Sequence, residues 1–421
     1  MTTGHEAMIV HPTGKGPNKK SIAIIVRRAF SGGSGHQAMI LGESLQRDGH
    51  AVAVVALQGS GRWVPRVGSA PTVVELGTGD TRSRVAGVVV RFRRWVIGPV
   101  ARLLMMRLRR ADGRWQRNGV WRWLLALAVA LSEQSIARRA KEVRTTIERL
   151  GSDTVVSFLP ITNFETAVAL WRHPAWLVCS ERNPPFPIKP TLDDTRVIVS
   201  ARADRFGANT ESAAKWLHQT FRRPDEPVAF TPNILVELPG RQAPRTSRLL
   251  VVSRLERTKG VDHALAALAC LDPRLGAELH IVGDGDLRES LESEAAKASL
   301  PVKFYGHVDS PESVFCDGGI LLQLSGQDGT PNSIMEAMSW GVPCIVSDQC
   351  PGPVRLVSDG LEECAAGLVV DGNSPEEVAS AVERILTEPG LADKLALGGR
   401  RRATAMLWHY QRATWSELLN L

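Results

Sequence analysis

The order strand, glycine-containing loop, helix, strand occurs twice along the chain, and this repeat restricts the available folds more than any other feature. In the first copy, an apolar run rich in β-branched residues at Ser21–Val26 leads into the glycine-rich stretch Ser31–Gly35. A helical pattern over His36–Asp48 and a second apolar run at Ala51–Leu57 follow. This order is typical of the start of a doubly wound α/β domain, in which helices connect buried parallel strands.

The second copy follows a polar stretch, Gln242–Ser247, that we interpret as a linker. Leu249–Ser253 is its first predicted strand, a loop with Lys259 and Gly260 comes next, and Val261–Leu271 is its first helix. The remaining predicted strands are Thr154–Phe158, Trp176–Cys179 and Val197–Ser200 in the first copy, and Leu279–Val282, Val302–Tyr305, Gly319–Leu324 and Pro343–Ser347 in the second. Two such domains place a ligand in the cleft between them, at the carboxyl ends of their strands.

A chain of 421 residues is also too long for one hydrophobic core, because single cores stop growing at about 250–300 residues. We expect a disordered lead-in at residues 1–20 and an N-terminal domain at 21–240, with a basic helical insertion at about 82–145. We further expect a C-terminal domain at 247–395 and a terminal helix at 396–421 that crosses back to the N-terminal domain.

Targeting signals and cysteine usage indicate a cytoplasmic protein. Residues 1–20 are polar and lack the apolar core of a signal peptide. The chain has no uninterrupted apolar window of the length needed to span a bilayer. Its six cysteines include no C-x-x-C pair, so we expect neither a disulfide framework nor a structural zinc site.

The net charge of +7 is concentrated in one segment. Residues 82–144 contain 16 Arg and Lys against three acids, a local charge of +13, and the rest of the chain carries −6. This segment also holds four Trp and apolar residues at helical spacing, a pattern typical of helices on anionic membrane surfaces. We therefore expect a peripheral protein on the inner face of the cell membrane. The alternative is that the apolar stripe packs on its own domain. Nucleic-acid binding is not expected, because no base-stacking module is recognisable.

The stretch from Ser325 to Pro343 contains the start of a helix suited to binding an anion. Pro331 fits the first turn and Thr330 could cap it. The free backbone amides would then be those of Asn332, Ser333 and Ile334, which suit a diphosphate.

Two carboxylates accompany this helix start. Glu336 lies about one turn further and can accept hydrogen bonds from ribose hydroxyls, whereas Asp328 precedes the helix and can reach a sugar hydroxyl. The alternative is an ordinary capped helix with surface acids.

The same stretch resembles the E-x7-E region of the retaining, GT-B-fold glycosyltransferases of the group 1 (family 4-type) family. Glu336 matches the second acid, and Asp328 stands where most members have Glu. Val252–Gly260 resembles the motif in which an Arg and a Lys clamp the donor diphosphate. The resemblance gives those roles to Arg254 and Lys259 and implies a GT-B architecture, with two Rossmann-like domains facing each other across a cleft.

Further segments resemble the same family. Ile281–Arg288 resembles its strand-to-helix turn, so the Asp284-Gly-Asp286 sequence is interpreted as structural and no metal or other cofactor is expected. Phe304–Val308 resembles a strand end near the nucleotide base, where Val308 could contact the base. Arg355 stands where many relatives have Glu.

In the N-terminal half, Ser31–Gln37 resembles the first glycine-rich loop of the family. Gly33 would approach the donor phosphates there, while His36 is either an acceptor-side group or a structural histidine. Two stretches resemble a subgroup that adds hexoses or N-acetylhexosamines to lipid-linked glycans. The acceptor-side residues that they imply are Asn163, Glu181 and Arg182.

The resemblance implies that a hexose or N-acetylhexosamine is transferred from a nucleoside-diphosphate sugar with retention of anomeric configuration. We expect the donor to be a UDP-sugar and the acceptor to be a lipid-linked or cell-surface glycan at the membrane surface. Three alternatives stay open. They are a GDP-mannose-dependent mannosyltransferase, a non-catalytic nucleotide-sugar scaffold, and an epimerase of the same architecture, which would need an acid/base pair of a carboxylate and a His that we cannot place.

Overall fold

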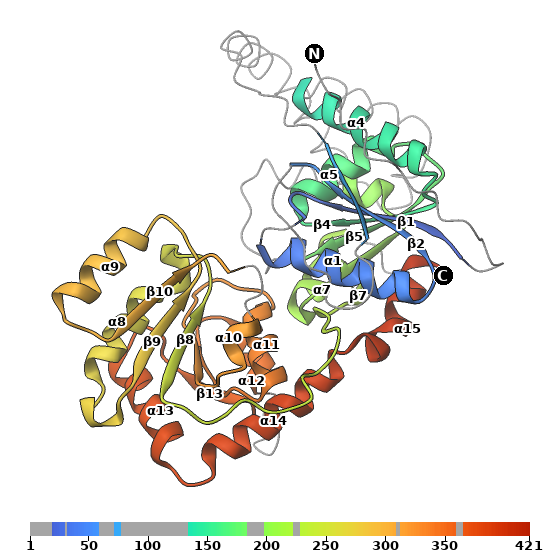
Figure 1. Cartoon of the computed structure of the whole chain (residues 1–421). Coiled ribbons are helices and arrows are strands. Elements are labelled where there is room, and N and C mark those ends of the chain that lie inside the picture. Colours follow the sequence, from blue (N-terminus) through green and yellow to red (C-terminus); the bar gives the residue numbers. More distant parts are fainter. Residues whose placement is uncertain are drawn as a thin grey trace, which may run out of the picture.

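The structure is a computed structural model with two α/β bodies that lie side by side (Figure 1). It describes residues 19–29, 32–58, 71–76, 134–182, 198–221, 228–308, 312–358 and 365–421. Each body contains one parallel sheet with helices on both faces, so the predicted pair of Rossmann-like domains is confirmed.

The N-terminal sheet has seven parallel strands in the order β3-β2-β1-β4-β5-β6-β7. Its strands are β1 Ser21–Val26, β2 Ala51–Ala56, β3 Thr72–Glu75, β4 Thr154–Phe158, β5 Trp176–Glu181, β6 Arg205–Ala208 and β7 Ala229–Phe230. The strand order reverses between β1 and β4, and the carboxyl ends of strands at such a switch point form a crevice for ligands.

The C-terminal sheet repeats this topology with six parallel strands in the order β10-β9-β8-β11-β12-β13. Its strands are β8 Arg248–Val252, β9 Glu278–Val282, β10 Val302–Gly306, β11 Ile320–Gln323, β12 Cys344–Ser347 and β13 Gly367–Val370. Here the order reverses between β8 and β11.

Helices cover both faces of each sheet (Figure 1). Those of the N-terminal body are α1 Gly32–Arg47, α4 Gln134–Leu150, α5 Pro160–Ala169 and α7 Glu211–Phe221. Those of the C-terminal body are η2 Arg257–Lys259, α8 Val261–Cys270, η3 Pro273–Leu275, α9 Arg288–Lys297, α10 Glu312–Phe315, α11 Asn332–Trp340, α12 Pro351–Val357, α13 Pro375–Thr387 and α14 Leu391–Ala405. The last helix, α15 Trp408–Leu419, returns to the N-terminal sheet and contacts β5, β6 and β7.

The apolar run of β1 is buried on both faces, as expected for a central parallel strand. Ile22 and Ile24 belong to a core that includes α1 and Trp415 of α15. Ala23 and Ile25 belong to the opposite core, together with buried residues of α4 and α5. A continuous apolar run, rather than an alternating one, is therefore what this position in the sheet requires.

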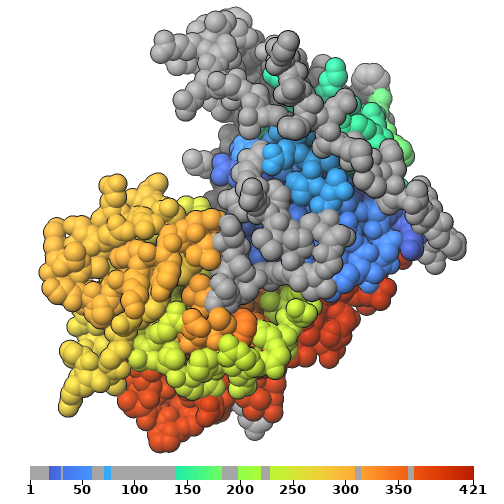
Figure 2. Space-filling view, in the orientation of Figure 1, coloured from blue at the N-terminus to red at the C-terminus, as the bar shows by residue number. Residues whose placement is uncertain are grey.

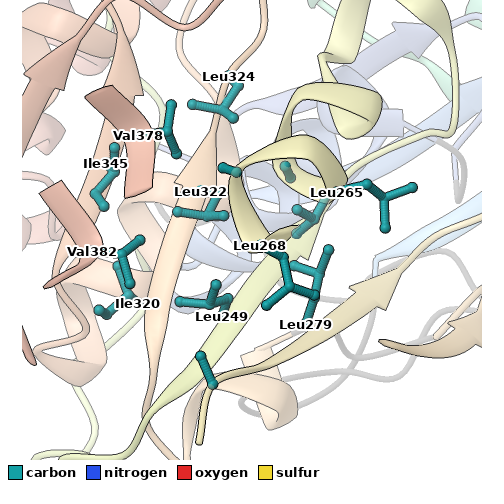
Figure 3. Close-up of a cluster of buried hydrophobic side chains, with 14 of the residues drawn as sticks. Leu249, Leu265, Leu268, Leu279, Ile320, Leu322, Leu324, Ile345, Val378 and Val382 are labelled. Carbon is teal, nitrogen blue, oxygen red and sulfur yellow. The ribbon is translucent and has the colours of Figure 1, made fainter. Parts of the chain in front are cut away.

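In the C-terminal body, aliphatic side chains of one face of the sheet pack against α8 and α13, which lie side by side (Figure 3). Leu249, Leu279 and Ile320 come from three neighbouring strands, and Leu265 and Val382 come from the two helices. These side chains are almost completely buried. The close packing of this core holds the strands in place, and with them the loops that follow their carboxyl ends.

The chain passes between the two bodies twice, and the two crossings are bonded to each other. Leu235, in the segment after β7, donates its N–H to the Met406 carbonyl at 2.9 Å, and Trp408 donates its N–H to the Leu235 carbonyl at 3.2 Å. In Figure 2 the C-terminal helices, in red, run along one side of the molecule under both bodies.

Two local predictions are wrong. Residues 198–202 are helical and the strand lies later, at β6. Ile198 and Val199 are buried in this helix. A run of about four apolar residues predicts burial, but it does not distinguish a strand from a turn of helix. The glycine-rich loop predicted at Ser31–Gly35 is also wrong over residues 32–35, which are helical because α1 begins at Gly32.

Most of the basic segment 82–144 lies outside the described residues, and so does the lead-in up to residue 18. The described end of the segment is part of α4, whose Val143 and Ile147 are buried in the core. Its Arg139 lies 3.0 Å from Glu165, and Arg144 lies 2.9 Å from Glu148. The apolar face of α4 therefore packs on its own domain, whereas the apolar residues at helical spacing that favoured membrane binding, within 96–108, lie outside the described residues. In the part of the chain that the structure describes, no helix is long and apolar enough to cross a membrane.

Candidate active site

The loops after β8 and β11 leave the C-terminal sheet at its switch point and pack closely together. Gly260 follows Lys259 with φ of 63°, and a Cβ added there would lie 2.4 Å from the carbonyl oxygen of Leu324. Only glycine allows this approach without a shift of the backbone. The tight contact brings Lys259, from the first loop, beside the second loop.

Lys259 and Asp328 form an ion pair at this junction. The Lys259 Nζ donates to Asp328 Oδ1 at 2.7 Å, and Gln323 Nε2 donates to Asp328 Oδ2 at 3.0 Å. The Ser333 hydroxyl donates to Gln323 Oε1 at 3.1 Å and so connects the pair to α11. The side chains of Lys259 and Asp328 are 14% and 18% exposed, which leaves the pair poorly screened but accessible to a ligand.

The backbone of Asp328 is held by Cys350, the residue before α12. Asp328 donates its N–H to Cys350 Sγ at 2.9 Å, and the thiol donates to the Asp328 carbonyl at 2.9 Å. Burial raises the pKa of the Cys350 thiol, so the group stays protonated and can act as this donor. Asp328 is therefore fixed through both its backbone and its carboxylate.

Helix α11 begins at Asn332 after Pro331 and has no side-chain cap. Thr330, the predicted cap, instead donates its hydroxyl to the Asn209 carbonyl of the N-terminal body at 2.9 Å. Because no side chain caps the first turn, the amides of Asn332, Ser333 and Ile334 stay available to an anion beside Lys259.

Arg254, the other predicted clamp residue, is placed differently from Lys259. Its side chain is 65% exposed and bonded to Glu256, two residues away. Val308 lies two residues beyond the end of β10 and is half-buried.

The N-terminal body faces α11 with the start of α1. Asn332 Nδ2 donates to the Gly33 carbonyl at 3.2 Å, and His36 Nε2 lies 3.5 Å from Glu336 Oε1. Glu336 is 5% exposed. The structure therefore brings together Gly33 and His36 from one body with Asn332 and Glu336 from the other.

The predicted acceptor-side residues divide into two groups. Asn163 Nδ2 donates to Glu181 Oε1 at 2.9 Å, and Ser157 donates its hydroxyl to Asn163 Oδ1 at 2.7 Å, at the carboxyl ends of β4 and β5. Arg182 has its guanidinium turned into the protein, 4.5 Å from the ring centroid of Phe158. Asn163 and Glu181 thus form one polar group at the carboxyl ends of β4 and β5, whereas Arg182 contacts the interior.

Several residues of this region were not predicted from the sequence, among them Gln37, Asn233, Gln323 and Cys350. Gln37 and Asn233 both bond to Asn332 from across the interface. Gln37 stands in the stretch that resembles the first glycine-rich loop of the family, but nothing in the local pattern indicates its partner.

The Asp284-Gly-Asp286 sequence forms a tight turn against the β8 loop. A Cβ on Gly283 would lie 1.8 Å from the Ser253 carbonyl oxygen, and Asp284 Oδ1 accepts from the Gly285 N–H at 2.8 Å. Among the described residues, no group of three or more His, Cys, Asp or Glu side chains is placed to hold a metal ion.

Comparison with known proteins finds a family match over the C-terminal body. The family described as "Glycosyl transferases group 1" matches residues 241–402, which contain Lys259, Asp328 and α11. An N-acetyl-D-galactosaminyltransferase of Campylobacter jejuni, named for a GalNAc-containing diNAcBac-PP-undecaprenol substrate, is 23% identical over 68% of this chain and 80% of its own length. A GDP-mannose-dependent phosphatidylinositol dimannoside mannosyltransferase of Mycobacterium tuberculosis is 30% identical over 42% of this chain and 44% of its own length. An exopolysaccharide phosphotransferase of Streptomyces coelicolor is 23% identical over 66% of this chain, which spans 30% of that relative's length.

Solved structures agree on the fold. HepE of Anabaena, solved in complex with UDP and glucose, has a TM-score of 0.69 at 15% identity and covers 96% of this chain and 100% of its own. Sucrose-phosphate synthase of Thermosynechococcus elongatus has a TM-score of 0.67 at 16% identity, over 96% of this chain and 98% of its own. The described residues have the GT-B fold, and the C-terminal body matches the group 1 glycosyltransferases, a family of transferase enzymes, over residues 241–402.

Proposed function

We propose that the protein transfers a hexose or N-acetylhexosamine from a nucleoside-diphosphate sugar to a hydroxyl of a lipid-linked or cell-surface glycan. The observation that carries this proposal is the Lys259–Asp328 pair beside the uncapped start of α11. A cation and several free backbone amides at one sheet switch point match the charge of a diphosphate. A neighbouring carboxylate matches the hydroxyls of a sugar.

In this proposal the diphosphate takes Lys259 away from Asp328. The Lys259 ammonium and the α11 amides then stabilise the negative charge on the leaving phosphate, and the released Asp328 carboxylate accepts a hydrogen bond from the transferred sugar. Glu336 holds the ribose next to His36. In the same step the largely exposed Arg254 side chain leaves Glu256 and binds the diphosphate.

Transfer with retention needs no protein group that carries the proton away. The bond from the anomeric carbon to the leaving phosphate oxygen breaks, and the bond to the acceptor oxygen forms on the same face of the sugar. The proton of the acceptor hydroxyl passes to the leaving phosphate oxygen. Asn163 and Glu181 form the polar group at the carboxyl ends of β4 and β5, and in this proposal they orient the acceptor.

We propose UDP as the nucleotide, with support from the fold similarity to HepE in complex with UDP and glucose. The relative named as GDP-mannose-dependent favours GDP-mannose as the second candidate. A thermal-shift comparison of UDP, GDP and their sugars decides between them, because a ligand at about 100 times its Kd stabilises the folded protein by about 2.7 kcal/mol. A shift with neither nucleotide would contradict the proposed donor site and favour a scaffold.

We also propose that residues 82–144 recruit the enzyme to an anionic membrane surface, on the basis of their net charge of +13. Each cation near such a surface contributes about 1 kcal/mol. Co-sedimentation with vesicles containing anionic lipid should therefore fall as salt rises, because the Debye length shortens from about 10 Å at 0.1 M to about 3 Å at 1 M.

Two matched variants serve this test. The first replaces Arg91, Arg93 and Arg94 by Gln. The second replaces three exposed arginines of the C-terminal body by Gln, namely Arg257, Arg274 and Arg384. The first set should reduce vesicle binding by about tenfold or more, since it removes three favourable charges, and the second set should leave it unchanged. Binding that does not respond to salt, or that falls equally with both sets, would count against the basic segment as the anchor.

A further inference from the structure

The side chain of Asn332, the first residue of α11, is bonded to the opposite body of the molecule. Its Oδ1 accepts hydrogen bonds from Asn233 Nδ2 at 2.7 Å and from Gln37 Nε2 at 3.2 Å, and its Nδ2 donates to the Gly33 carbonyl at 3.2 Å. The same residue offers its backbone amide to the proposed donor phosphate. One residue thus connects the phosphate site with three points of the N-terminal body.

Asn233 is the centre of these contacts, and it lies in the chain crossing that leads from β7 to β8. Besides Asn332, its Nδ2 donates to the Thr330 carbonyl at 2.8 Å, and its Oδ1 accepts from Arg182 Nη1 at 3.1 Å. Asn233 is almost fully buried, with 4% of its surface exposed. Its amide therefore has fixed donors and acceptors on both sides of the interface.

Gln37 is fixed equally well. The Ile234 N–H donates to Gln37 Oε1 at 2.6 Å, and Gln37 Nε2 donates to the Ile234 carbonyl at 3.1 Å. This paired contact joins α1 to the residue that follows Asn233, so the start of α1 and the chain crossing form one rigid unit against α11.

Arg182 supports Asn233 from the interior of the N-terminal body. Its Nη1 also donates to the Thr231 carbonyl at 2.9 Å, and its guanidinium lies 4.5 Å from the ring centroid of Phe158 and 5.5 Å from that of Trp415. Burial lowers the pKa of Arg182 to about 9, which leaves it charged at neutral pH. A buried cation that packs against two aromatic rings has little freedom to move, so it fixes the orientation of the Asn233 amide.

We infer that Asn233 and Arg182 are positioning residues for sugar transfer: Asn233, held by Arg182, binds Asn332 in the closed arrangement of the two bodies and so aligns the start of α11 with Gly33. Closure of the two bodies then brings the N-terminal body against a phosphate site that the C-terminal body already forms. Neither residue needs to touch the substrate. The catalytic part of this inference rests on the proposed function, whereas the closure of the two bodies does not.

Asn233→Asp is the sharpest test, because it preserves the size of the side chain and the acceptor for Arg182. It removes both N–H donors and places carboxylate oxygen against the Asn332 Oδ1 and the Thr330 carbonyl. Asn373→Asp makes the same chemical change at an exposed position beyond β13 and serves as the control. Small-angle X-ray scattering should give a larger radius of gyration for Asn233→Asp than for the wild type and the control.

The kinetics should separate positioning from binding. Asn233→Asp should lower kcat for transfer by about 10- to 100-fold, the size expected for two lost hydrogen bonds. The Kd of the nucleotide should change less than about threefold, because Lys259 and the α11 amides all belong to the C-terminal body. Wild-type scattering together with wild-type kcat would overturn the inference, and so would an equal loss of nucleotide affinity and kcat without opening.

Gln37→Glu provides a second variant that keeps the acceptor for the Ile234 N–H and loses the donor to Asn332 and to the Ile234 carbonyl. It should open the two bodies in the same way, and an unchanged radius of gyration in both folded variants would overturn the inference. If the wild-type protein transfers no sugar at all, the proposed function fails, and the scattering comparison still decides whether Asn233 holds the two bodies together.

Discussion

Lys259→Ala should lower kcat/KM for sugar transfer by about 10²- to 10³-fold, the usual effect of removing one group that stabilises transition-state charge. The loss of the leaving diphosphate is the step that needs this cation. The fold should be unaffected, because Gln323 still donates to the Asp328 carboxylate at 3.0 Å and Cys350 still holds its backbone.

Lys303→Ala is the matched control for this experiment. Lys303 is also paired with a carboxylate in the C-terminal body, 2.6 Å from Glu278, but it lies on the edge strand β10 and its side chain is 57% exposed. Initial rates at varied donor concentration, with thermal unfolding as a check on folding, measure both variants. Turnover by folded Lys259→Ala equal to that of the control would refute the role of Lys259.

Trp415→Ala should destabilise the N-terminal body by about 3–5 kcal/mol, the range observed when a buried aromatic residue is truncated. Trp415 is fully buried in α15, its ring centroid is 6.5 Å from that of Phe158, and Arg182 packs over it. Helix α15 thus contributes to the core on one face of the N-terminal sheet. For a unit of about 200 residues, this loss lowers the Tm by roughly 6–20 °C.

Tyr410→Ala is the control for this prediction, because Tyr410 is an aromatic residue of the same helix with 57% of its surface exposed. Differential scanning calorimetry should show a lower transition for the N-terminal body in Trp415→Ala and no comparable change in Tyr410→Ala. Equal Tm values for the two variants would show that α15 is not required for the N-terminal core.

Much of the fold follows from the sequence because its signals are local. Ser21–Val26 is a continuous apolar run rich in β-branched residues. Such a run predicts a strand that is buried on both faces, and Ser21–Val26 is a central strand of its sheet. Val261 begins a helix directly after Gly260, where the left-handed backbone conformation suits glycine. In contrast, residues 198–202 form a helix although their apolar run fits a strand equally well.

Of the predicted residues that the C-terminal body supplies, Lys259 and Asp328 form a pair, whereas Arg254 is bonded to Glu256. Lys259 and Asp328 both follow strands at a single switch point, so the topology brings them together although 69 residues separate them. The contacts between the two bodies depend on long-range geometry instead. Asn233 and Asn332 are separated by 99 residues, and no local pattern predicts that their amides meet. Thr330 shows the same limit, because a capping position predicts a local bond and the hydroxyl is bonded to Asn209 of the other body.

The most direct test of the central claim is the release of free nucleoside diphosphate from nucleotide sugars by the purified wild-type chain. We expect at least one UDP-sugar to be consumed, with UDP released and the sugar recovered on a lipid-linked or glycan acceptor, and we expect Lys259→Ala to abolish most of this turnover. Consumption of GDP-mannose instead would change the donor and keep the enzyme class. If the folded wild-type protein releases no nucleoside diphosphate from any UDP- or GDP-sugar in the presence of such acceptors, the account is contradicted.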